Sequence, residues 1–145
     1  MVTRKRRTRV LVLGDPALRK AMADEVREGT AFEVIGVPRV VLIQATVRES
    51  ARRSLFHLGE VLVSEAKVRV AASVGWGLIQ GREFEAALDL ALIDAAWAAG
   101  IPPVVGWTTR LVAAETALEA RLDREQASLA ATSVAFETLD QGGAT

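Results

Sequence analysis

Residues 82–99, REFEAALDLALIDAAWAA, decide the fold of this chain. The stretch predicts one helix that ends at Gly100, because the Pro102-Pro103 pair beyond it cannot continue a helix. After Arg82 its only polar residues are Glu83, Glu85, Asp89 and Asp94. A helix that is apolar nearly all round is usually covered on more than one side. We therefore expect it to need more cover than so small a domain supplies, and we expect a partner to provide the rest.

The residues before this helix, 32–80, predict a β-sheet. They are rich in β-branched and apolar residues without helical spacing, and turn residues punctuate them. Lys67-Val68-Arg69-Val70 alternates polar and apolar residues, as a strand with one solvated face does. The connections are too short for crossover helices, so neighbouring strands should be antiparallel. We expect an α+β fold with helices packed on an antiparallel meander of about four to six strands.

The N-terminal part predicts a helix preceded by a charged arm. Asp15 can cap the helix, Pro16 suits its first position and Gly29 ends it, which gives a helix over residues 16–28. We interpret residues 1–9 as a basic, flexible, solvated arm; their cations are Arg4, Lys5, Arg6, Arg7 and Arg9. The alternative is an arm that binds a phosphate backbone with salt-sensitive affinity.

The C-terminal part predicts one more helix and a short strand. The helix is expected over residues 109–131, with a buried stripe that includes Leu118 and Leu129. The last strand is suggested by Val134, Phe136 and Leu139. We expect residues 140–145 to form a frayed tail and residues 1–145 to form a single domain.

Composition excludes several classes of chemistry. The 145 residues carry 18 basic and 18 acidic side chains, so a net charge of zero argues against nucleic acid as a partner. The chain has no cysteine and a single histidine, His57, and therefore offers no thiolate, no iron–sulfur ligands and no two-histidine metal site. No apolar run approaches the roughly 20 residues of a membrane span. We expect a soluble, cytoplasmic protein without a membrane partner.

Two features suggest a small-molecule site. Residues 75–81 place three glycines between a strand and a helix, but the spacing differs from the dinucleotide-binding turn, and we favour glycines that relieve crowding. Asp94 lies among apolar residues and needs a partner, for which a backbone amide or an internal arginine is favoured over a catalytic role. A stand-alone nucleotide-binding enzyme that uses Gly75 to Arg82 and Asp94 is the alternative function.

An ordered series of motifs resembles a known family. The series comprises Phe56-His57-Leu58-Gly59-Glu60, Glu65-Ala66-Lys67-Val68-Arg69-Val70, Gln80-Gly81-Arg82, Ala91-Leu92-Ile93-Asp94-Ala95 and Thr132-Ser133-Val134-Ala135-Phe136-Glu137-Thr138. In order and spacing it resembles the PhnG subunits of bacterial carbon–phosphorus lyase over nearly the whole chain. No single segment is diagnostic; the series is.

The resemblance implies a small α+β subunit of a complex that degrades organophosphonates. That complex joins a phosphonate to the ribose of ATP, giving ribose 1-phosphonate 5-triphosphate, before a radical SAM subunit cleaves the carbon–phosphorus bond. The resemblance also implies that the chain has PhnI-, PhnH-, PhnJ- and PhnL-type partners in a hetero-oligomer. ATP, SAM and an iron–sulfur cluster belong to the complex, and this chain is expected to hold no cofactor, metal or catalytic residue. The interface or structural residues we expect are Phe56, Gly59, Glu60, Gly75, Gln80, Gly81, Arg82, Phe84, Asp94 and Trp97.

Overall fold

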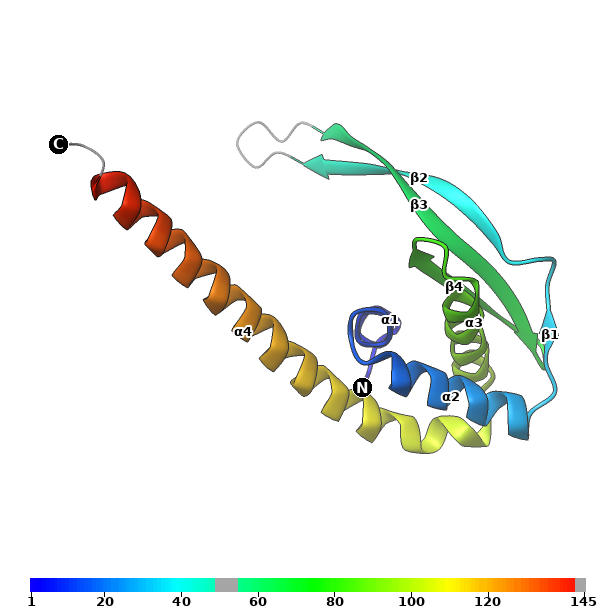
Figure 1. Ribbon diagram of the computed structural model, residues 1–145. Coiled ribbons are helices and arrows are strands. Elements are labelled where there is room, and N and C mark those ends of the chain that lie inside the picture. Colours follow the sequence, from blue (N-terminus) through cyan, green and yellow to red (C-terminus); the bar gives the residue numbers. More distant parts are fainter. Residues whose placement is uncertain (49–54, 143–145) are drawn as a thin grey trace.

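A computed structural model describes residues 1–48 and 55–142 and has the expected α+β architecture (Figure 1). Its capping follows the sequence, since the Asp15 side chain accepts a hydrogen bond from the Ala17 amide and Gly100 ends a helix in the left-handed conformation. The elements are α1 Arg4–Leu13, α2 Pro16–Gly29, β1 Glu33–Val34, β2 Arg39–Arg48, β3 Leu55–Val70, β4 Ser73–Gln80, α3 Phe84–Ala99, the 3₁₀ helix η1 Pro102–Gly106 and α4 Trp107–Gly142.

The sheet is antiparallel, as predicted, and is built around the 16-residue strand β3. β1 and β2 pair with one edge of β3, and β4 pairs with the other edge. β4 reaches only as far as Val63 of β3, so beyond that point β2 and β3 continue as a two-stranded hairpin. Figure 1 shows this hairpin extending away from the helices.

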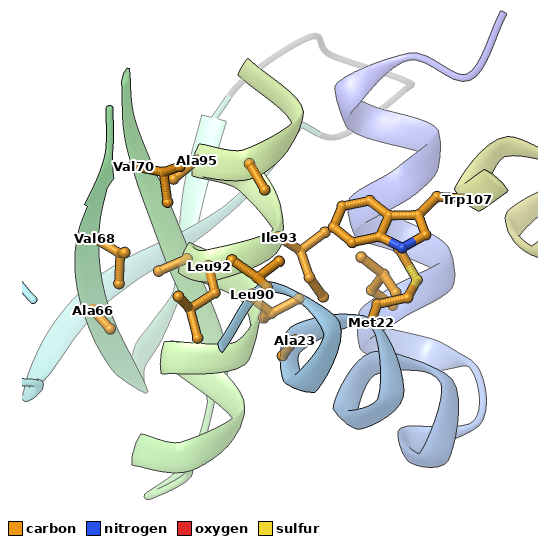
Figure 2. Packing of buried hydrophobic residues seen from close by; sticks show 14 of the residues in the cluster. Met22, Ala23, Ala66, Val68, Val70, Leu90, Leu92, Ile93, Ala95 and Trp107 are labelled. Atoms are coloured by element: carbon orange, nitrogen blue, oxygen red, sulfur yellow. The ribbon is translucent and has the colours of Figure 1, made fainter. Parts of the chain in front are cut away.

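The core lies between the sheet and the N-terminal helices, with α3 in the middle. Figure 2 shows Val68 and Val70 facing α3 from the sheet, while Met22 and Trp107 lie on the opposite side of the helix. All four of these side chains are fully buried. The expectation that α3 needs cover from a partner is therefore wrong, because α1, α2 and the start of α4 supply the second layer. Ten of its residues are buried: Ala86, Ala87, Asp89, Leu90, Ala91, Leu92, Ile93, Asp94, Ala95 and Ala96.

The ends of the chain differ from the sequence-based expectation. Residues 4–9 are not a flexible arm but the first turns of α1, capped by the Thr3 side chain and packed through buried Val10 and Leu11. The predicted strand over residues 134–139 is also wrong, because α4 runs unbroken to Gly142. No glycine or proline interrupts the chain between Trp107 and Gly142, so nothing in the sequence stops the helix at 131. Part of the expected frayed tail is thus helical, and residues 143–145 lie outside the described residues.

Candidate functional site

Asp94 on α3 is held by three groups from two other elements. Its Oδ1 accepts hydrogen bonds from Arg4 Nε at 3.0 Å and from Arg7 Nη2 at 2.7 Å. Its Oδ2 accepts from Arg4 Nη2 at 2.6 Å and from the backbone N–H of Trp76 at 3.0 Å. The prediction that Asp94 bonds to an internal arginine or a backbone amide is confirmed in both its forms. With four donors on two oxygens, this carboxylate ties α1 and the edge strand β4 to α3.

Arg7 and Trp97 continue this cluster inward. The Arg7 side chain is buried, and its guanidinium carbon lies 4.6 Å from the ring centroid of Trp97, a cation–π contact. Trp97 in turn stacks on Trp107, with 6.1 Å between centroids. Burial lowers the pKa of Arg7, and the charge of Asp94 opposes this shift. Trp97 therefore already has two partners within its own chain, and its role at an interface stays a prediction.

The glycines of β4 allow the backbone of this strand to pack directly against the backbone of α3. A Cβ on Gly75 would lie 2.2 Å from the Ala91 oxygen and from the Ala95 nitrogen. A Cβ on Gly77 would lie 1.9 Å from the Ala87 oxygen. Both distances are far below van der Waals contact, so the interpretation that these glycines relieve crowding is confirmed. α3 fills the space that a phosphate would need.

The turn from β4 to α3 is closed by its own hydrogen bonds. Gly81 has a φ of +90°, its N–H donates to the Leu62 oxygen at 2.8 Å, and its oxygen accepts from Ser64 Oγ at 2.5 Å. Ser64 is fully buried, and its Oγ also accepts from the Glu83 N–H at 2.8 Å. The Gly81 amide is therefore not free to bind an anion, because its proton is already donated. Around this turn Gln80, Arg82 and Phe84 are exposed.

A third group of predicted residues lies on the β2–β3 hairpin. The ladder runs from Ala45 opposite Gly59 to Thr46 opposite His57, which leaves Leu58 as the extra residue of a β-bulge. Gly59 has a φ of +133°, a conformation that side chains disfavour, and this explains the glycine at the bulge. Glu60 is exposed. The Phe56 backbone pairs with Val47, but its side chain lies outside the described residues.

Two ion pairs between distant residues were not predicted, and one of them involves a buried carboxylate. Asp89 is only 7% exposed and pairs with Arg27 at 2.6 Å. Burial raises the pKa of Asp89, and Arg27 opposes the rise. Glu25 accepts a hydrogen bond from Trp107 Nε1 at 2.9 Å and pairs with Arg110. A contact between residues so distant in sequence leaves no local pattern, although the position of Asp89 among apolar residues of α3 was a signal.

The predicted residues therefore occupy three separate places: the Asp94 cluster, the β4–α3 turn and the hairpin. They do not line one pocket. Within residues 1–48 and 55–142, no group of three or more His, Asp or Glu side chains is placed to hold a metal ion. Over the same residues, no single helix is both long and apolar enough to cross a membrane; only the sharply bent pair Phe84–Ala99 and Pro102–Ala131 passes on length and composition.

Fold and candidate residues together define a class: a small α+β protein in which the buried carboxylate of Asp94 holds three elements together, while Glu60 and Arg82 are exposed. The comparison with known families is specific. The family described as Phosphonate metabolism protein PhnG matches residues 2–142, so this chain belongs to the PhnG family and takes part in phosphonate metabolism. No curated protein matches the sequence.

Proposed function

We propose that this chain is a non-catalytic subunit of the carbon–phosphorus lyase complex. In this role it packs against a PhnI-type subunit, together with PhnH-, PhnJ- and PhnL-type subunits. It thereby stabilises the cytoplasmic assembly that forms ribose 1-phosphonate 5-triphosphate from ATP and a phosphonate. ATP, SAM and the iron–sulfur cluster are held by the partners.

One observation carries the proposal: two long elements leave the core and expose apolar side chains. On the hairpin, Leu42 and Leu58 are 62% and 63% exposed; on the outer half of α4, Leu129 is 69% exposed. Figure 1 shows the hairpin and α4 diverging from the body of the protein. An isolated two-stranded hairpin and an unsupported helical segment are each marginally stable in water. Both arms therefore gain most by packing on another protein.

The candidate groups already form hydrogen bonds within the chain, and this supports a non-catalytic role. Asp94 has all its hydrogen-bonding positions occupied, and the Gly81 amide donates to Leu62. A buried carboxylate held by two arginines lacks a free position for proton transfer. The alternative function, a stand-alone nucleotide-binding enzyme, would need these same groups to be free.

Co-expression with the PhnI-, PhnH- and PhnJ-type subunits of the same genome tests the proposal. We expect the full chain to co-purify with them at fixed stoichiometry. Leu42→Glu and Leu129→Glu should each weaken assembly about tenfold or more, as expected for loss of buried apolar contacts at an interface. Both side chains are exposed in the free chain, so its melting temperature should not change. Val105→Glu is the matched control, because Val105 is 85% exposed on η1, away from both arms. Absence of a complex with the wild-type chain would refute the proposal.

A further inference from the structure

The N-terminal helix α1 carries more positive charge than the fold neutralises. Five of the six residues 4–9 are cationic. Asp94 forms ion pairs with Arg4 and Arg7, and Glu115 on α4 forms an ion pair with Arg6. Lys5 and Arg9 form no ion pair within 4 Å in the described part of the chain. Three of the five cations thus pair with two carboxylates, and Lys5 and Arg9 are left without an ion pair among the described residues, although the charge of Glu115 acts on Arg9 from a longer distance.

The positions of these cations raise the electrostatic cost of the excess positive charge. The first turn of α1 contains no acidic residue, so the cations lie at the positive end of the helix dipole. Lys5 and Arg9 are also one turn apart, a spacing at which like charges repel. An anionic group bound at this helix would remove both costs. The free chain thus holds a charge arrangement that favours an acidic ligand.

The same two cations lie on an exposed face of α1 that also carries apolar side chains. This face is open to solvent and consists of Arg4, Lys5, Thr8, Arg9, Val12 and Leu13. Its cations lie toward the start of the helix, and its apolar side chains, including Leu13 at 48% exposed, lie at the end. This face of α1 is therefore matched to a ligand that is acidic at one end and apolar at the other.

The surroundings of α1 favour a protein segment over a lipid surface. On one side α1 meets β4, where Arg4 and Thr8 share a pocket with Trp76. On the other side it meets α4 through the Arg6–Glu115 ion pair. Figure 1 shows α1 within the angle between the hairpin and α4. A flat bilayer would meet the hairpin and α4 before it reached α1.

We infer that this exposed face of α1 binds an acidic, amphipathic segment of the PhnI-type partner. Carboxylates of that segment pair with Lys5 and Arg9, and one of its apolar side chains packs on Val12 and Leu13. This inference rests on the proposed function, and it adds the place and the chemistry of one contact. Charge pairs of this kind set specificity and association rate.

Zero-length carbodiimide cross-linking of the purified complex tests the contact. The reagent joins a lysine amine to a carboxylate in contact with it, and the chain has only three lysines, Lys5, Lys20 and Lys67. We expect Lys5 to cross-link to an aspartate or glutamate of the PhnI-type subunit. Lys20 should cross-link within the chain to Asp24, 2.9 Å away, which verifies the reagent. A Lys5 cross-link to a second copy of this chain would overturn the inference.

Charge reversal supplies the second measurement. K5E/R9E should weaken assembly about tenfold or more and flatten its dependence on salt. The free variant should remain folded, because glutamate at position 5 suits the helix dipole and neither Lys5 nor Arg9 forms an ion pair in the described part of the chain. K20E/R69E, which reverses two exposed cations elsewhere, should leave affinity within about twofold.

The outcomes separate the two proposals. If the wild-type chain forms no complex, the proposed function and this inference both fail. If it forms one and K5E/R9E assembles with unchanged affinity and salt dependence, only the inference fails. Salt-dependent binding of the free chain to phosphatidylglycerol vesicles, lost in K5E/R9E, would likewise overturn it in favour of a lipid surface.

Discussion

Gly77 on β4 lies against the carbonyl of Ala87 on α3 so closely that a Cβ at position 77 would be 1.9 Å from that oxygen. Strand and helix therefore meet at their backbones, without a layer of side chains between them. The opposing atoms belong to the α3 backbone and cannot rotate away. The position of α3 on the sheet thus depends on the absence of one side chain.

Gly77→Ala should destabilise the protein by about 3 kcal/mol or more, because strand and helix must separate to admit the methyl group. Chemical denaturation of the free chain measures this loss. Gly106→Ala is the control, since no atom lies within 4 Å of the added Cβ. Equal stability of the two variants would show that β4 and α3 do not pack as described.

Asp94→Asn should cost about 3 kcal/mol, because it leaves the buried guanidinium of Arg7 without its counter-ion. A double-mutant cycle with Arg7→Met measures the coupling of the pair, which should be largely lost once either partner is absent. The comparison variant is Lys20→Gln, which removes an exposed pair with Asp24 and should have no measurable effect. A fully additive cycle would contradict the ion pair between Asp94 and Arg7.

Glu25 should make stability depend on acid pH. Partial burial acts to raise the pKa of Glu25. The hydrogen bonds from the Trp107 N–H and from Arg110, together with the charge of Arg110, outweigh this effect, and they hold the pKa below its usual value of 4.5. A carboxylate with a lowered pKa in the folded state contributes stability above its unfolded pKa and loses it as the pH falls through its folded pKa. Glu25→Gln should therefore lower the melting temperature at pH 7, and the difference from wild type should shrink below pH 4.5. A difference that stays constant across this range would contradict the assigned shift.

The sequence predicted what local patterns determine. Asp15 and Gly100 mark helix ends through capping and left-handed geometry, and alternation around Val68 identifies a strand with one buried face. The need of Asp94 for a partner followed from its apolar neighbours alone. These features require no knowledge of distant parts of the chain.

The remaining features depend on contacts between distant residues. Arg4 and Arg7 reach Asp94 across about ninety positions, so a basic run that resembles a solvated arm becomes a packed helix. The carboxylate that neutralises the cations is what allows α1 to cover α3. The exposed apolar surface lies on the hairpin and on α4, where Leu42 and Leu129 are exposed, and not on α3. The prediction that Leu129 belongs to a buried stripe is therefore wrong, because the outer half of α4 has left the core.

Hydrogen exchange measured by mass spectrometry, on the free chain and on its complex with the PhnI-type subunit, tests the subunit role most directly. In the free chain, amides of the hairpin at residues 42–46 and of α4 beyond residue 122 should exchange quickly, because this part of the hairpin lies past the end of β4 and the α4 side chains at 123–131 are exposed. In the complex both segments should become strongly protected, while the buried strand residues 64–70 change little. Exchange that is identical with and without the partner would contradict the proposal that these two arms are its binding surfaces.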